Sequence, residues 1–173
     1  MLNFSKTHVV KIVSGGQTGA DRAGLEAAKQ LGIATGGFAP LHFRTQNGND
    51  YSLKDFHLEE DSSYHYAPRT AKNIKASDGT IIIALNLNSP GCSLTKKYAA
   101  QFKKPVFLVQ LSSSGFYDLE DVNSAEHWVQ QNQISILNVA GNREVFQNGK
   151  SLVFEPTFSF ITRLLKKTNH ESI

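Results

Sequence analysis

The sequence contains a single cysteine, Cys92, among its 173 residues. One thiol cannot form an internal disulfide, and it excludes a zinc site built from several cysteines of the chain. The first residues lack an apolar run as long as that of a signal peptide, and no stretch approaches the roughly 20 apolar residues of a membrane span. These absences indicate a reducing environment, and we expect a cytoplasmic protein that does not enter a membrane.

Neither sign of charge is in large excess. The 18 Lys and Arg residues against 15 Asp and Glu residues leave a formal net charge of +3. The lysine pairs at 96–97, 103–104 and 166–167 fall at predicted helix positions, where solvated lysines are ordinary. Nucleic acid, whose binding calls for a concentrated basic surface, is therefore not an expected partner. With 40% hydrophobic residues the chain can bury one core, and we expect a single domain over residues 1–173.

Apolar runs typical of buried strands alternate with segments of helical spacing. Strands are predicted at 8–14, 33–38, 80–87, 106–111 and 134–139. Helices are predicted at 18–31, 68–76, 94–102, 119–131 and 157–167. Such alternation is typical of βαβ units with right-handed crossovers. It predicts an α/β, Rossmann-like, doubly wound and mainly parallel sheet of about five strands, with helices on both faces.

One long segment, residues 39–68, interrupts this alternation. It has little periodicity and many polar or aromatic residues. A loop of this length inside a small domain is either functional or disordered. A lid that closes over a ligand is one hypothesis for it.

A glycine-rich loop joins the first predicted strand to the first predicted helix, and it reads Ser14-Gly15-Gly16-Gln17-Thr18-Gly19-Ala20-Asp21-Arg22. Glycines let a backbone approach a ligand with its N–H groups outward, and a helix N-terminus adds partial positive charge, so the loop favours an anion. It matches neither G-x-G-x-x-G nor the Walker pattern, so neither NAD binding nor ATP hydrolysis is inferred. The alternative is a plain turn of positive φ with Thr18 as the helix N-cap.

A second run of small residues, Pro90 to Thr95, follows the third predicted strand. Open α/β sheets bind ligands beyond the carboxyl ends of their strands, so the two loops are expected to face one crevice. The alternative is that Ser93 is only a helix cap and Cys92 an unreactive loop residue. Arginines in or beside predicted loops can hold a phosphate or carboxylate through two parallel bonds, although a single arginine is more often a surface residue. These arginines are Arg44, Arg69 and Arg143.

Several separated segments, in this order, resemble the putative molybdenum carrier family. This family is also described as the circularly permuted YpsA-like branch of the SLOG nucleotide-binding proteins, which are related to the lysine-decarboxylase-like fold. The segments are the 14–22 loop, Tyr66-Ala-Pro-Arg-Thr70, Asn73 with Ser77-Asp-Gly-Thr80, and Asn138-Val-Ala-Gly141 with Arg143. The resemblance covers about residues 8–145. It implies a Rossmann-like fold, a homo-oligomer, and binding of the molybdenum cofactor (molybdopterin) or a nucleotide.

The resemblance places ligand-binding positions in the first loop, in the helix after the long segment and in the second loop. We also include the Asp-Gly turn before the third predicted strand among the candidate binding positions, although such a dipeptide is on its own an ordinary turn. The candidate cofactor-binding residues are Gly15, Gly16, Gln17, Thr18, Gly19, Asp21, Arg22, Arg69, Thr70, Asn73, Ser77, Asp78, Gly79, Gly91, Cys92, Ser93 and Thr95. No catalytic residue is assigned, and no metal site is expected.

The chain departs from the family pattern at two places. It has Arg44-Thr-Gln-Asn-Gly48 where the family tends to have Arg-x-Glu-Asp-Gly, and Gly91-Cys-Ser-Leu-Thr95 where the family has Gly-Thr-x-Leu-Thr. Distant relatives that cleave nucleoside monophosphates carry a catalytic glutamate in the region where this chain has Lys96 and Lys97.

These observations predict a small-molecule-binding protein, a carrier of molybdenum cofactor that holds an anionic, phosphate-bearing ligand at the glycine-rich loop. An enzyme is the less favoured class, because no constellation of acid, base and nucleophile is evident. One alternative is a nucleotide-binding sensor that acts through a protein partner. The other is a nucleoside-phosphate hydrolase in which Asp21 or Asp78 supplies the carboxylate.

Overall fold

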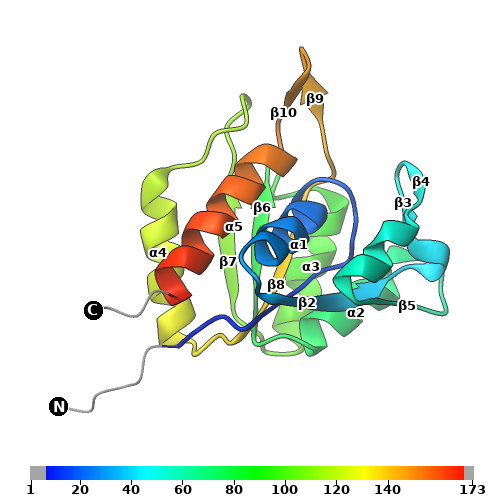
Figure 1. Ribbon diagram of the computed structural model, residues 1–173, viewed down its shortest axis with the longest axis horizontal. Coiled ribbons are helices and arrows are strands. Elements are labelled where there is room, and N and C mark those ends of the chain that lie inside the picture. The colour runs from blue at the N-terminus through cyan, green and yellow to red at the C-terminus, as the bar shows by residue number, and fades with distance from the viewer. Residues whose placement is uncertain (1–6, 170–173) are drawn as a thin grey trace.

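A six-stranded sheet forms the centre of the computed structural model, which describes residues 7–169 (Figure 1). All five strand pairings in this sheet are parallel. The strand order is β5-β2-β1-β8-β6-β7. The strands are β1 (Lys11–Val13), β2 (Ala34–Ala39), β5 (Leu58–Glu60), β6 (Gly79–Ala84), β7 (Val106–Gln110) and β8 (Ile136–Gly141). The prediction of a parallel sheet is confirmed, with one edge strand, β5, more than the sequence indicated.

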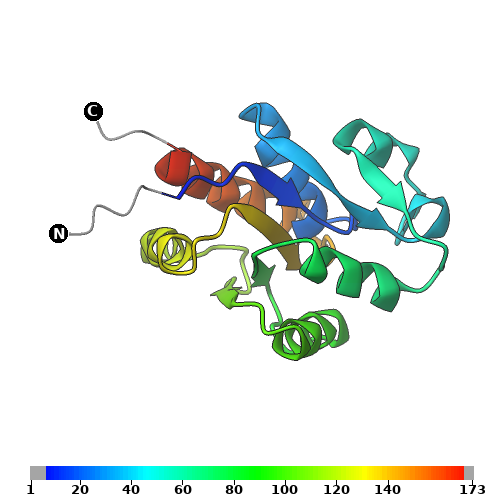
Figure 2. The same cartoon turned by 90° about the horizontal axis from the view of Figure 1, so that it is seen from below.

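Helices cover both faces of this sheet, as the doubly wound prediction requires (Figure 2). The first, fourth and fifth helices pack on one face, where the fifth contacts each of the other two. The second and third pack on the other. They are α1 (Ala20–Gln30), α2 (Tyr66–Lys75), α3 (Pro90–Gln101), α4 (Leu119–Gln131) and α5 (Phe154–Asn169). Of the helices within residues 7–169, none combines the length and apolarity that a bilayer crossing requires.

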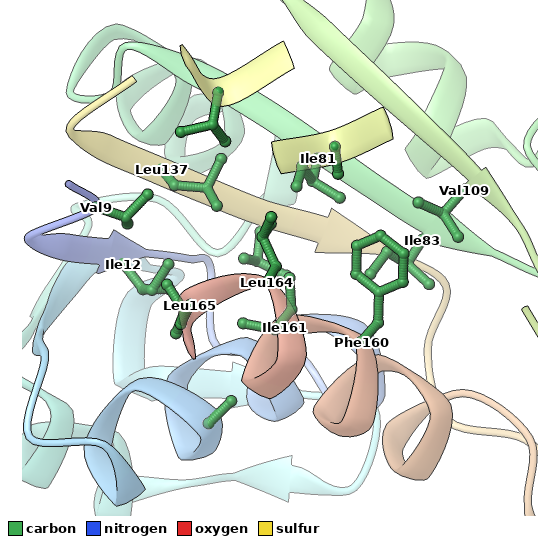
Figure 3. Close-up of a cluster of buried hydrophobic side chains, with 14 of the residues drawn as sticks. Val9, Ile12, Ile81, Ile83, Val109, Leu137, Phe160, Ile161, Leu164 and Leu165 are labelled. Atoms are coloured by element: carbon green, nitrogen blue, oxygen red, sulfur yellow. The ribbon is translucent and has the colours of Figure 1, made fainter. Parts of the chain in front are cut away.

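The main hydrophobic core lies between the sheet and α5 (Figure 3). Ile81 of β6 and Leu137 of β8 meet Phe160 and Leu164 of α5, and all four side chains are fully buried. Burial of each such side chain contributes roughly 1.5–3 kcal/mol. On the opposite face Ile82 packs with residues of α3. The apolar run of β6 is continuous because helices cover it on both sides.

The long segment after β2 is folded, so the disordered alternative is wrong. It contains η1 (Leu41–Phe43), β3 (Arg44–Thr45), β4 (Gly48–Asn49), η2 (Tyr51–Phe56) and β5. Phe43, Leu53, Phe56 and Leu58 form a small core of their own with Leu25 of α1. Its short 3-10 helices and two-residue strands leave neither a helical nor an alternating period, which is why the sequence pattern indicated only a loop.

The starts of two helices differ from the prediction. α3 begins at Pro90 rather than at residue 94, because the Ser89 side chain accepts a hydrogen bond from Cys92 N at 3.4 Å and proline suits the first helical position. Gly91 to Thr95 therefore lie in the first turns of a helix and not in a loop. The N-cap of α1 is Gly19, without a side-chain cap bond, so the predicted Thr18 cap is wrong.

A second short hairpin, β9 (Phe146–Gln147) and β10 (Lys150–Ser151), projects from the molecule before α5 (Figure 1). The sequence pattern did not indicate it. The Glu144 carboxylate accepts hydrogen bonds from Val153 N at 3.1 Å and Phe154 N at 2.9 Å. It thereby caps α5, which begins at Phe154 and not at the predicted residue 157.

Candidate functional site

A pocket of about 750 Å³ lies at the carboxyl ends of β1, β6 and β8, between α2 and α3. Tyr66, Arg69, Thr70 and Asn73 enter it from α2, at the spacing i, i+3, i+4, i+7 that places residues on one helix face. The first two turns of α3 form a second wall, and residues 138–143 at the end of β8 form the floor. Of the described residues in the 39–68 segment, Tyr66, in the first turn of α2, lines the pocket; closure of this segment over a ligand stays a prediction.

The pocket brings together eight of the predicted positions from three segments of the chain. The 14–22 and 90–95 segments face one crevice, as expected, although β8 lies between β1 and β6 in the sheet. Ligand pockets in open parallel sheets occur at such points, where connections leave the sheet in opposite directions. The eight residues are Gly15, Gln17, Asp21, Arg69, Thr70, Asn73, Gly91 and Thr95.

Three predicted positions lie at the amino end of β6 and therefore at the opposite edge of the sheet: Ser77 and Asp78 precede this strand, and Gly79 is its first residue. The Asp78 carboxylate accepts hydrogen bonds from Ser135 N at 2.9 Å and Ile136 N at 2.7 Å, which fixes the start of β8 beside β6. The structure gives these residues a role in strand pairing, away from the pocket.

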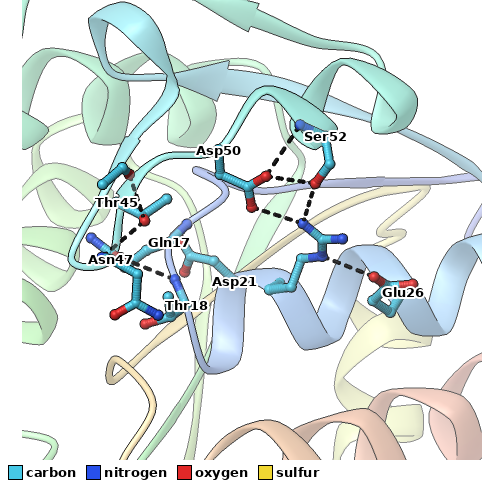
Figure 4. A network of polar contacts seen from close by, with 10 residues as sticks. Gln17, Thr18, Asp21, Glu26, Thr45, Asn47, Asp50 and Ser52 are labelled. Carbon is cyan, nitrogen blue, oxygen red and sulfur yellow. Dashed lines mark hydrogen bonds and ion pairs between the residues drawn. The ribbon is translucent and has the colours of Figure 1, made fainter.

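Six further predicted positions stand beside the pocket without lining it. Gly16 and Gly19 have φ of +74° and +80°, and an added Cβ would lie 2.6 Å from Leu53 Cδ1 at the first and 2.5 Å from Asn142 O at the second. Packing of neighbouring segments thus accounts for both glycines. The Arg22 guanidinium bridges Glu26 and Asp50 (Figure 4). The six residues are Gly16, Thr18, Gly19, Arg22, Cys92 and Ser93.

The glycine-rich loop already holds an anion, the carboxylate of Asp21. Asp21 Oδ2 accepts a hydrogen bond from Gln17 N at 3.2 Å and lies 3.1 Å from Arg69 Nη1. Burial raises the pKa of Asp21, against the lowering by Arg69 and by hydrogen bonds from the loop backbone. Gln17 Oε1 accepts from Thr18 N at 3.0 Å and from Gln46 N at 2.9 Å. Much of the predicted phosphate cradle is therefore satisfied from within the protein.

Two other donors in the wall of the pocket lack partners. Arg69 Nε and Gln17 Nε2 are buried and have no hydrogen-bond partner among the described residues. The side chain of Arg69 is only 13% exposed, and Gln17 only 6%. A buried donor without a partner costs free energy, so such groups are normally satisfied by water or a ligand. Both residues line the pocket, so the two donors lie in its wall, and we call this part of the wall the polar end.

Most other predicted polar residues in the lining are engaged with the protein. Asn73 Oδ1 accepts from Phe38 N at 2.8 Å and its Nδ2 donates to Phe38 O at 3.0 Å, which ties α2 to β2. The hydroxyls of Thr70 and Thr95 donate to carbonyls four residues earlier in their own helices. Gly91 differs, because a Cβ there would meet nothing within 4 Å and would extend into open space at the pocket wall.

Sequence reasoning missed several lining residues, notably Tyr66, Ser89 and Asn142. Asn142 Oδ1 accepts from Asn86 N at 2.9 Å and its Nδ2 donates to Ser89 Oγ at 3.0 Å, which joins the end of β8 to the segment before α3. Tyr66 itself and residues 138–141, which precede Asn142, were part of the family resemblance, and that was the available signal. Arg143, singled out as a possible anion-binding residue, lines the pocket.

The thiol of Cys92 is buried and does not line the pocket. Burial raises the pKa of Cys92, so the thiol stays protonated near neutral pH. Within residues 7–169 no group of three or more His, Cys, Asp or Glu side chains is placed to hold a metal ion. The described residues thus offer the pocket no thiolate ligand.

The fold and the pocket position define a Rossmann-like α/β protein with a pocket at the carboxyl edge of its parallel sheet. The chain belongs to the circularly permutated YpsA SLOG family, whose sequence model matches residues 12–162. The suspected resemblance is thereby confirmed at the level of the family.

A solved structure agrees with this assignment. The chain is 32% identical to a protein described as a putative molybdenum carrier protein from Syntrophus aciditrophicus SB, with a TM-score of 0.80. The match covers 93% of this chain and 98% of that one. No protein of curated function matches the chain.

Proposed function

We propose that this protein binds a small, anionic, phosphate-bearing molecule in the pocket beside the glycine-rich loop, and that this molecule is the molybdenum cofactor, carried as cargo. The observation that carries the proposal is the pair of buried donors without partners, Gln17 Nε2 and Arg69 Nε, in a pocket of about 750 Å³. Pockets of this size suit compact organic ligands. The description of the similar solved structure as a molybdenum carrier supports the choice of cargo.

The lining suits an organic ligand with one charged end. Arg69 and Arg143 lie at the polar end, and Leu85, Leu94 and Val139 supply apolar surface for a ring system. Because the described residues offer no thiolate to the pocket, the protein would hold the organic part of the cofactor and leave the metal to the cofactor's own ligands. Gly15 and Gln17 keep the glycine-rich loop in the wall of the site.

A nucleotide is the second candidate ligand, since it also joins a flat ring to a phosphate. Hydrolysis of a nucleoside phosphate would have to use Asp21, which is the carboxylate in the described lining of the pocket. The other residue considered for this role, Asp78, lies at the opposite edge of the sheet. Asp21 is already paired with Arg69, which favours binding over catalysis.

Native mass spectrometry of the purified protein mixed with molybdenum cofactor, AMP, ATP or NAD tests the proposal. We expect retention of a molybdopterin-sized adduct by the wild type and its loss in Gly91→Val, whose side chain would project into the pocket. Ala100→Val is the matched control, because it adds a valine at an exposed position of the same helix. Retention of a nucleotide alone would favour the sensor or, if product appears on prolonged incubation, the hydrolase. Equal retention by both variants would place the ligand elsewhere.

The proposal includes a cytoplasmic homo-oligomer. Phe116, Leu119 and Phe146 are large apolar side chains that are mostly exposed in one copy of the chain, which supports assembly. Size-exclusion chromatography with light scattering measures the mass, and a monomer at micromolar concentration would contradict this part.

A further inference from the structure

Three arginines surround the ring of Tyr66; Tyr66, Arg69 and Arg143 line the pocket, and Arg44 contacts the ring from outside the lining. The Cζ atoms of Arg44, Arg69 and Arg143 lie 5.1, 5.6 and 5.1 Å from the ring centroid. They come from β3, from α2 and from the segment after β8. Cation–π contact extends to about 6 Å, so all three guanidinium groups are held by one uncharged ring.

Their positive charge is only partly compensated. Arg69 pairs with Asp21 at 3.1 Å, whereas Arg44 Nη1 donates at 3.1 Å to a carbonyl, that of Tyr64. Arg143 makes no hydrogen bond or ion pair with the described residues; its guanidinium group contacts the ring of Tyr66. Three guanidinium groups thus face one carboxylate, which leaves two positive charges around one ring.

Glu144, the acidic residue next to Arg143 in the sequence, does not pair with it. Glu144 uses its carboxylate for Ser151 Oγ at 2.8 Å and for the backbone N–H groups at the start of α5. An acid close to the cluster is thus committed elsewhere. Like charges gathered without counter-charges repel one another, and the arrangement becomes favourable when an anion binds between them.

The unpartnered donors belong to residues of the same pocket lining. Arg69 Nε belongs to the cluster, and Gln17 Nε2 projects from a glutamine that is 6% exposed, in the same lining as Tyr66, Arg69 and Arg143. Guanidinium groups bind tetrahedral oxyanions through parallel charge-assisted hydrogen bonds, and an amide N–H can donate to a further oxygen.

We infer that Arg69, Arg143 and Arg44 form a subsite for a doubly charged tetrahedral oxyanion group, and that Tyr66 is its positioning residue. The group is either a phosphate ester on an organic ligand or a free oxyanion such as phosphate or molybdate. The inference rests on the proposed function, because it assumes that the pocket binds a ligand. It adds which residues of the pocket bind the charged group of that ligand. Because the ring is neutral, it gathers the arginines without using up their charge.

Isothermal titration with inorganic phosphate, molybdate and AMP tests the subsite directly. Arg143 is exposed, so Arg143→Ala is expected to fold, and we expect it to weaken binding of each anion by about tenfold, the effect of one charge-assisted hydrogen bond. Arg163→Ala, at an exposed position of α5, removes the same charge outside the pocket and should change affinity less than twofold. Tighter binding of AMP than of either free oxyanion would identify an ester, and the reverse a free oxyanion.

The role of Tyr66 has its own test. Tyr66→Leu changes no charge but removes the ring, so we expect weaker oxyanion binding in that variant and near wild-type binding in Tyr66→Phe. Circular dichroism melting separates loss of binding from loss of fold. Equal affinities for Tyr66→Leu and Tyr66→Phe in folded protein would overturn the positioning role.

The inference and the proposed function fail in different ways. If the protein retains an organic ligand but Arg143→Ala binds as tightly as Arg163→Ala, the subsite is wrong and the proposed function stands. If the oxyanions bind in an arginine-dependent way while no organic ligand is retained, the subsite stands and the carrier proposal fails. No oxyanion binding at millimolar concentration by the wild type would overturn the subsite.

Discussion

The guanidinium group of Arg69 occupies the space in which the side chain of residue 15 would begin. A Cβ built on Gly15 would lie 1.4 Å from Arg69 Nη1. The absence of a side chain at Gly15 therefore lets α2 deliver a cation to the end of β1, where it meets Asp21. This glycine is needed for an internal ion pair, whereas the loop pattern alone indicated the close approach of a ligand.

Gly15→Ala is expected to destabilise the protein by about 3 kcal/mol, because it displaces Arg69 and leaves the buried Asp21 carboxylate without its partner. Chemical denaturation followed by circular dichroism measures the free energy of unfolding. Gly91→Ala is the matched control, since its methyl group would meet nothing within 4 Å. Equal stabilities of the two variants would show that Arg69 relocates at no cost.

The raised pKa of Asp21 predicts a dependence of stability on pH. An acid whose pKa is higher in the folded than in the unfolded protein adds stability below its ordinary value near 3.8, and this is lost as the pH rises through the folded pKa. We therefore expect the stability of the wild type relative to Asp21→Asn to fall as the pH rises above the ordinary value of 3.8. A relative stability that rises instead would show that Arg69 outweighs burial.

The contribution of Asp61 to stability depends on pH in the opposite sense, because the pKa of Asp61 is lowered. Lys72 Nζ lies 2.7 Å from Asp61 Oδ2, and its hydrogen bond is the main cause that lowers the pKa of Asp61. This pair adds stability above the ordinary value near 3.8, which is lost as the pH falls through the lowered folded pKa.

Since Lys72 is 48% exposed, Lys72→Met should cost only about 1 kcal/mol at pH 7 and almost nothing near pH 2. Lys75→Met is the control, because Lys75 also lies over an aromatic ring but has no carboxylate partner among the described residues. Thermal melts at the two pH values make the comparison. A cost for Lys72→Met that persists at low pH would assign the effect to packing on Phe38.

The cap of α5 can be removed by Glu144→Ala. The carboxylate satisfies Val153 N, Phe154 N and Ser151 Oγ, so its loss should cost about 1–2 kcal/mol. Glu155→Ala removes an exposed acid in the first turn of the same helix and should cost less than about 0.5 kcal/mol. Hydrogen exchange of the Phe154 amide offers a local readout, and unchanged protection in Glu144→Ala would contradict the capping role.

The parts of the fold that the sequence predicted are those in which local pattern and burial agree. The helix at 119–131 was predicted with its observed bounds, and the Ile81–Ile83 run indicated a central parallel strand. The two-residue strands of the hairpins and the edge strand β5 carry no comparable pattern, because pairing with distant residues decides them.

For the site, the sequence predicted that residues 14–22 and 90–95 share one crevice. The sequence did not show that the Asp21 carboxylate binds the backbone of the loop, because no local pattern predicts which carboxylate accepts a hydrogen bond from a given loop. The cluster at Tyr66 joins Arg44 and Arg143, which are 99 residues apart in the numbering. Only the assembled sheet brings such positions together. The position of residues 77–79 could have been foreseen, because residues that precede a parallel strand lie at its amino end.

The central place of β8 has a consequence for synthesis on the ribosome. The strands β5, β2 and β1 on one side and β6 and β7 on the other have no pairing with each other until residues 136–141 enter between them. A nascent chain that stops short of this strand presents two half-sheets, each with an open inner edge, which are prone to association with other chains. The same late strand supplies the pocket floor. Completion of the sheet and of the pocket floor therefore arrive in a single step, when residues 136–141 join the two half-sheets.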